Sequence, residues 1–117
     1  MTKIFLKEGV LLNGATSWLW SGITLAAPVL GRYTGSCTIT SILDGKHSQG
    51  SLHYLGRAAD LRSQTVSRPE LERCLRDLME ALGPDWDVLL EKLGTPDEHF
   101  HIEFDPKGPR KALLGEA

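Results

Sequence analysis

The segment His-Phe-His-Ile-Glu-Phe at residues 99–104 alternates polar and apolar side chains without a break. Side chains along a β-strand point to opposite faces in turn, so this pattern predicts a strand with one apolar and one polar face. The apolar side chains, which we expect to pack against helices, are Phe100, Ile102 and Phe104. The polar side chains, which must border a cleft or solvent, are His99, His101 and Glu103. The chain therefore needs a second layer on one side of this strand.

An amphipathic helix is predicted to supply part of that layer. Apolar residues recur there at helical spacing, and they are Leu71, Cys74, Leu75, Leu78, Met79 and Leu82. Ser67 and Glu70 fit a capping box at the start of the helix, and Gly83-Pro84 predicts its end. We expect this helix to support the fold and to contribute no catalytic or metal-binding residue.

The remaining patterns predict the other elements of the fold. Thr16 and Ser17 can cap an earlier helix that runs to Leu30, with Pro28 expected to kink its end. The predicted strands cover residues 37–42, 57–61, 86–91 and 99–104, the last two forming a hairpin. This order predicts an α+β fold, with helices on one face of a small, mainly antiparallel sheet. At 117 residues we expect a single domain, 1–117.

The composition of the chain argues against several classes of partner. A formal net charge of -2 gives no bulk attraction to nucleic acid. The most apolar segment, residues 17–30, is too short and too broken to span a bilayer. The N-terminus lacks a secretory signal pattern, so we expect the protein to be made in the cytoplasm. Hydrophobic residues make up 41% of the chain, enough for a core that does not depend on a metal alone.

The two cysteines, Cys37 and Cys74, are too few for a disulfide framework. Cys74 lies on the apolar face of the predicted helix, which favours a buried and reduced thiol. A single Cys37–Cys74 disulfide is the alternative.

The histidines of the chain lie near two segments, and they are His47, His53, His99 and His101. Imidazole is the commonest side-chain metal ligand, so this clustering is the main functional signal. His53 and Asp60 flank a turn in which Gly56 lets the backbone reverse closely. A His, an Asp and a distant second His make a three-ligand set with one open position, which is typical of catalytic rather than structural zinc.

The segment from Ser51 to Asp60 fits the S-x-H-x-x-G-x-A-x-D signature of the zinc D-Ala-D-Ala carboxypeptidases and L-Ala-D-Glu endopeptidases, which include many phage endolysins. His99-Phe-His101 resembles the H-x-H signature of the same family. The detailed match to this family covers residues 38–104. The same segments also resemble the zinc domain of hedgehog signalling proteins. The resemblance implies a hedgehog/D-Ala-D-Ala-peptidase-like zinc domain with one bound Zn²⁺ ion. The implied ligands are His53, Asp60 and His101.

A zinc hydrolase also needs a base to accept a proton from water, and two glutamates compete for this role. If the last two predicted strands pair, Glu91 lies beside His99 on the metal face. Strand parity turns Glu98 toward the side of Phe100, so we favour Glu91 as the base. The resemblance implies that His99 stabilises the tetrahedral intermediate or positions water. Glu103 shares this face, where we expect it to form a solvent-facing salt bridge.

The resemblance implies that the substrate is a peptide bond in peptidoglycan stem or cross-link peptides, with His47 and Ser51 as candidate substrate contacts. Such an enzyme, phage-encoded or bacterial, would be a monomer that acts on the cell wall after release or from a virion. The identity of the cleaved bond stays open. The alternative function is a non-catalytic, zinc-stabilised binding module of hedgehog type. A closed structural site would need His99 or Glu91 as its fourth ligand.

Overall fold

The computed structural model describes residues 2–10, 14–42 and 56–106, and within them five strands and two α-helices. The helices are α1 (Ser17–Thr34) and α2 (Leu71–Leu82), the latter preceded by the short 3₁₀ turn η1 (Arg68–Glu70). The strands are β1 (Lys3–Leu6), β2 (Ser36–Ser41), β3 (Ala58–Arg62), β4 (Trp86–Glu91) and β5 (His99–Phe104). The predicted bounds of β4 and β5 are confirmed, and those of β2 and β3 differ by one residue.

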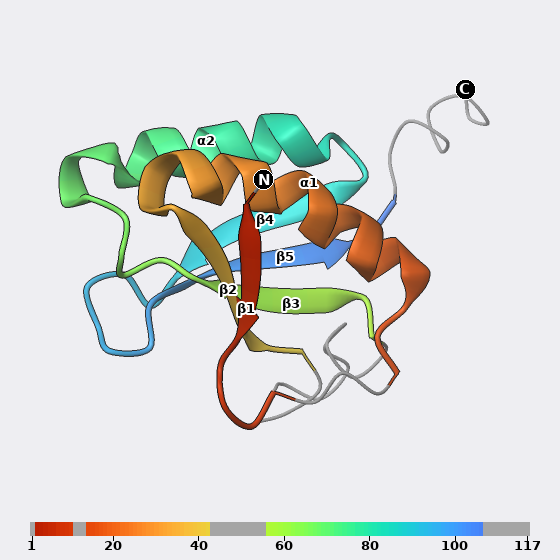
Figure 1. Cartoon of the computed structure of the whole chain (residues 1–117). Coiled ribbons are helices and arrows are strands. Elements are labelled where there is room, and N and C mark those ends of the chain that lie inside the picture. Colours follow the sequence, from red (N-terminus) through yellow and green to blue (C-terminus); the bar gives the residue numbers. More distant parts are fainter. Residues whose placement is uncertain (1, 11–13, 43–55, 107–117) are drawn as a thin grey trace.

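All five strands form one sheet in the order β1-β2-β3-β5-β4. The β2–β3, β3–β5 and β4–β5 pairs are antiparallel, whereas β1 runs parallel to β2. Both helices lie side by side on the same face of the sheet (Figure 1). The predicted α+β fold with a mainly antiparallel sheet and helices on one face is therefore confirmed in outline.

The sequence patterns do not predict β1, which is an exposed edge strand. Its residues show no alternation between a buried and an exposed face, because all four side chains are exposed. Only the backbone pairing of residues 3–6 with β2 makes this segment a strand. Alternation of hydrophobicity cannot report a pairing of that kind.

Helix α1 begins where the sequence indicates and ends later. The hydroxyl of Thr16 accepts a hydrogen bond from the backbone N–H of Leu19 at 3.2 Å, which confirms the predicted cap. The helix continues through Pro28 to Thr34, so the predicted end at Leu30 is wrong. Gly35, with φ of 89°, ends it in the left-handed conformation that favours glycine.

The predicted capping box at the start of the second helix is wrong. The side chain of Ser67 makes no capping hydrogen bond, and the 3₁₀ turn η1 separates it from α2. The carboxylate of Glu70 instead accepts a hydrogen bond from Arg73 at 2.7 Å, so it does not reach back to Ser67. The end of α2 at Leu82, followed by Gly83 with φ of 85°, is as predicted.

The core lies between the helices and the covered face of the sheet. Its largest fully buried side chains include Leu19, Ile23, Leu30, Ile39, Leu61, Leu78, Phe100 and Ile102. Helix α1 approaches β4 closely at Gly22, where a Cβ atom would lie 2.1 Å from the ring of Trp86. Cys37 and Cys74 are buried free thiols, as predicted, and burial raises their pKa values to about 11 and about 12.

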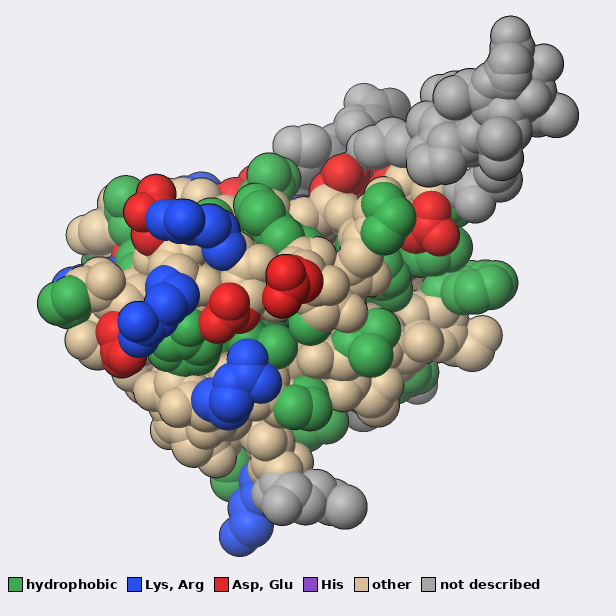
Figure 2. All heavy atoms as spheres, turned by 90° about the horizontal axis from the view of Figure 1, so that it is seen from above, with side chains coloured by type: hydrophobic (Ala, Val, Ile, Leu, Met, Phe, Trp, Pro, Cys, Tyr) green, Lys and Arg blue, Asp and Glu red, His purple; other side chains and the backbone are tan. Residues whose placement is uncertain are grey.

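The outer surface of the helices is mixed in charge. Basic and acidic side chains are interspersed over it (Figure 2), and two of the ion pairs there are Arg73–Glu70 and Arg76–Glu72. Exposed pairs of this type contribute little to stability. Among the described residues, no helix is long and apolar enough to cross a membrane.

Candidate metal centre

The face of the sheet opposite the helices carries nine side chains from three neighbouring strands in a regular array. The strand register places them in three rows across β3, β5 and β4. The rows are Ala58–Glu103–Asp87, then Asp60–His101–Leu89, then Arg62–His99–Glu91. Because side chains on one face of a sheet stand next to each other at these positions, the register alone makes His101 the centre of the array.

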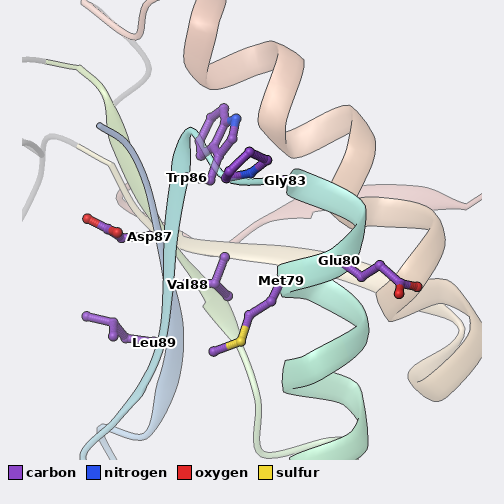
Figure 3. A pocket seen from close by; sticks show the side chains of 8 residues that line it. Met79, Glu80, Gly83, Trp86, Asp87, Val88 and Leu89 are labelled. Carbon is purple, nitrogen blue, oxygen red and sulfur yellow. The ribbon is translucent and has the colours of Figure 1, made fainter. Parts of the chain in front are cut away.

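Strand β4 shows this separation of faces directly. Val88 points toward α2, where it lines a groove with Met79 and Trp86, whereas Asp87 and Leu89 point to the other side of the strand (Figure 3). The groove therefore faces the helix layer. The polar array lies on the opposite face of the sheet.

Asp60 and His101 are the two predicted metal ligands that lie within the described residues. The Nδ1 atom of His101 lies 3.0 Å from the Oδ1 atom of Asp60. Both residues are buried, with 8% of Asp60 and 7% of His101 exposed. Two ligand atoms bound to the same tetrahedral zinc ion at about 2.0–2.1 Å would be about 3.3 Å apart, so this separation is close to what a shared ion requires.

Glu91 lies near this pair. One carboxylate oxygen of Glu91, one of Asp60 and a ring nitrogen of His101 all lie within 4.8 Å of one another. Carboxylate oxygen and imidazole nitrogen are both ordinary ligands of Zn²⁺, and they also accept other divalent metals. The donor set therefore fits a metal, although its ligand types do not select zinc alone.

His99 links Glu91 to the rest of the site. Its Nδ1 atom lies 2.7 Å from the carbonyl oxygen of Asp97, which can only accept, so Nδ1 must carry a hydrogen and donate it. Its Nε2 atom lies 2.9 Å from Oε1 of Glu91 and 3.5 Å from Oδ1 of Asp60. A hydrogen bond between Nε2 and Glu91 then needs a second proton, held on one partner or the other. The predicted position of Glu91 beside His99 is confirmed.

Each ring nitrogen of His101 contacts a carboxylate. Nδ1 faces Asp60, and Nε2 lies 2.6 Å from Oε1 of Glu103. Burial alone would lower the pKa of His101, but the hydrogen bonds to Asp60 and Glu103 outweigh it and raise the pKa to about 9. The expectation that Glu103 only forms a solvent-facing salt bridge is wrong, because its carboxylate binds the ring of His101.

Glu98, the competing candidate for the base, has a structural role in the loop between β4 and β5. Its carboxylate accepts hydrogen bonds from Arg68 at 2.8 Å, from the hydroxyl of Ser63 and from the backbone N–H of Gly94 at 3.0 Å. Burial would raise the pKa of Glu98, but these three donors lower it to about 2. Both of its oxygens thus tie the β4–β5 loop to the segment before α2.

Gly56 positions the strand that carries Asp60. Its φ of 70° is left-handed, and a Cβ atom there would lie 1.9 Å from the carbonyl oxygen of Gly14. Its own carbonyl oxygen accepts hydrogen bonds from the backbone N–H of Thr16 at 3.0 Å and from the Thr16 hydroxyl at 2.9 Å. Gly56 thus joins the start of β3 to the start of α1. The predicted reversal between His53 and Asp60 includes residues outside the described ranges.

The structure brings together Asp60, His101, Glu91 and His99 among the predicted site residues. The other three, His47, Ser51 and His53, lie outside the described residues. The contact between Glu103 and His101 is missed by the sequence analysis, although the spacing of two residues on one strand already places both on the same face. Neither a scan of protein-family models nor a search of curated proteins found a match to this chain.

Proposed function

We propose that this protein is a zinc-dependent peptidase that hydrolyses a peptide bond of bacterial peptidoglycan, on a domain of the hedgehog/D-Ala-D-Ala-peptidase type. The observation that carries the proposal is the 3.0 Å separation of Asp60 and His101, with Glu91 beside them. Asp60 and His101 come from the two segments that resemble the signatures of that peptidase family. The mixed sheet with two helices on one face is compatible with such a fold.

The residues that would hold the zinc ion are His53, Asp60 and His101, with His53 assigned from the signature alone. A bound zinc ion supplies Lewis-acid polarisation of the scissile carbonyl and acidifies the attacking water. The 3.0 Å between Asp60 and His101 is close to the separation of about 3.3 Å that two ligands of one zinc ion need. Little rearrangement of these two side chains would be required on binding.

Glu91 is the proposed general base. It lies within reach of the candidate metal ligands, and one of its oxygens contacts Nε2 of His99. A proton taken from water by the carboxylate of Glu91 can return to the leaving amine, while the Nε2 atom of His99, 2.9 Å away, orients that carboxylate. The hydrogen bond from Nδ1 of His99 to Asp97 fixes the orientation of the ring for this contact.

One observation favours a second function, a zinc-stabilised binding module without catalysis. The oxygen of Glu91 lies near enough to the candidate ligand atoms of Asp60 and His101 to become a ligand itself. A zinc ion held by Glu91 and the three signature residues would have four protein ligands and no open position. Such a closed site would stabilise the domain and would not activate water.

Cleavage of defined muropeptides separates the two functions. The purified protein is incubated with stem peptides and cross-linked peptides, with and without a chelator, and the products are identified by mass spectrometry. The peptidase predicts products that disappear with chelator, return with added zinc and are absent for Asp60→Asn. A protein that binds one zinc ion tightly but cleaves none of these peptides would be a binding module.

A further inference from the structure

We infer that Glu103 is a positioning residue of the metal centre, which holds the ring of His101 so that Nδ1 faces Asp60. The inference rests on the proposed function only in requiring that a divalent metal binds Asp60 and His101. Glu103 itself is not among the proposed metal ligands. It acts on the metal through the histidine that it contacts.

The contact is short and shielded from solvent. Oε1 of Glu103 lies 2.6 Å from Nε2 of His101, and the exposed fractions of the two side chains are 21% and 9%. Because a carboxylate without its proton can only accept, Nε2 of His101 is the donor. A hydrogen bond to a charged acceptor of this length is among the stronger ones in proteins.

The strand register explains how Glu103 reaches His101. The two residues are two apart on β5, so their side chains stand on the same face about 6.6 Å apart at the backbone. The neighbour of Glu103 on β3 is Ala58, which is fully buried and ends at Cβ. A long side chain at position 58 would compete for the space beside Glu103. Alanine leaves the carboxylate room to lie along the strand toward His101.

The contact also decides which nitrogen of His101 can bind a metal. Nδ1 is the atom that faces Asp60, and its hydrogen must leave before a metal can bind there. An imidazole that keeps its hydrogen at Nε2, donated to Glu103, then offers its lone pair at Nδ1. Rotating the ring by half a turn about Cβ–Cγ would place Cδ2 and Cε1 where Nδ1 and Nε2 now lie, and would break the contacts with both Asp60 and Glu103. The carboxylate thus removes the rotamer freedom that metal binding would otherwise have to remove.

Zinc affinity, measured by competition with a chelator of known affinity, tests this role without relying on activity. We expect Glu103→Ala to raise the zinc dissociation constant by about 10–100-fold, the usual effect of losing such a partner. Glu103→Gln keeps an acceptor oxygen without its charge, so it should lose less. The matched control is Asp87→Asn, which removes one negative charge from the position directly opposite Glu103. We expect that control to change the affinity less than about threefold.

A spectroscopic measurement separates positioning from loss of charge. In the zinc-loaded protein, ¹⁵N NMR of the histidine rings should show the Nε2 hydrogen of His101 retained in the wild type and in Asp87→Asn. The same hydrogen should exchange with solvent in Glu103→Ala. Each variant is first checked for cooperative unfolding in the metal-free form, and Glu103→Gln serves where Glu103→Ala does not fold.

The outcomes distinguish this inference from the proposed function. Wild-type zinc affinity in folded Glu103→Gln and Glu103→Ala would overturn the role of Glu103, as would an equal loss in Asp87→Asn. A wild-type protein that binds zinc but cleaves no muropeptide would overturn the peptidase and leave the role of Glu103 intact. A wild-type protein that binds no divalent metal would overturn both.

Discussion

Asp60 and His101 stand opposite each other on β3 and β5, with 3.0 Å between Oδ1 and Nδ1, although 41 residues separate them in the chain. The antiparallel register of the two strands creates this contact, and the hairpin of β4 and β5 adds Glu91 to it. Burying the carboxylate of Asp60 beside an imidazole is favourable only when a shared proton or a bound metal ion compensates the negative charge.

Asp60→Asn should abolish zinc binding. The amide is a much weaker ligand than the carboxylate and brings no charge to the site. After dialysis against zinc-free buffer, metal analysis should find about one zinc ion per wild-type chain and almost none in the variant, as expected for the loss of one of three ligands. Added zinc should raise the melting temperature of the wild type and leave that of Asp60→Asn unchanged. Glu72→Gln on the exposed side of α2 is the control, and full zinc content in Asp60→Asn would contradict the assignment.

Glu91→Gln should lower turnover by roughly 10²–10⁴-fold while the zinc content stays at the wild-type level, because the amide cannot accept the proton from water. Glu98→Gln should keep most of the turnover, since its carboxylate is engaged by Arg68 and Ser63. Steady-state cleavage and metal analysis on the same samples check both. Loss of zinc from Glu91→Gln would instead identify Glu91 as a ligand and favour the closed site.

Because of Glu98, the free energy of unfolding should fall as the pH is lowered below 4.5. Its pKa is lowered to about 2 in the folded state, against an ordinary value of 4.5, so the charged form is bound more tightly by the folded protein. The resulting stabilisation, about 3 kcal/mol, is complete above pH 4.5 and is lost as the pH falls from 4.5 toward 2. Urea unfolding at pH 7, 4 and 3 should show a steeper loss for the wild type than for Glu98→Gln. Parallel pH profiles of the two proteins would show that the ion pair with Arg68 is not the cause.

Gly56→Ala should destabilise the protein more than Gly35→Ala. Both glycines have left-handed backbones, with φ of 70° and 89°, so both substitutions carry a backbone cost of about 1–2 kcal/mol. Only at Gly56 would the new Cβ atom collide with another backbone atom, the carbonyl oxygen of Gly14 at 1.9 Å. Denaturant unfolding of both variants measures the difference. Equal losses would mean that the connection between Gly14 and Gly56 adjusts easily.

Phe100→Ala should cost about 3–5 kcal/mol, because it removes a fully buried ring from the centre of the core. Leu93→Ala is the matched control, since 64% of Leu93 is exposed and its removal leaves no cavity. Chemical denaturation of each variant gives the change in unfolding free energy. A loss at Leu93 as large as that at Phe100 would contradict the assignment of Phe100 to the core.

The local patterns of the sequence determined β4, β5 and α2 because each of these elements has its own periodicity. Alternation fixes which side chains of residues 99–104 share a face, and the helical spacing of residues 71–82 fixes which side faces the core. The position of Glu91 beside His99 followed from the same parity, because the two strands are connected by a short loop.

Only the tertiary structure decided the relations between segments that are distant in the chain. The parallel pairing of β1 with β2, the register that sets Asp60 opposite His101, and the capture of Glu98 by Arg68 and Ser63 have no local signal. The contact of Glu103 with His101 is short-range, but only the tertiary structure places the small Ala58 of the neighbouring strand beside Glu103. The local sequence determines which face of a strand or helix a side chain occupies. The residue that this side chain contacts depends on strand register and on the packing of distant segments.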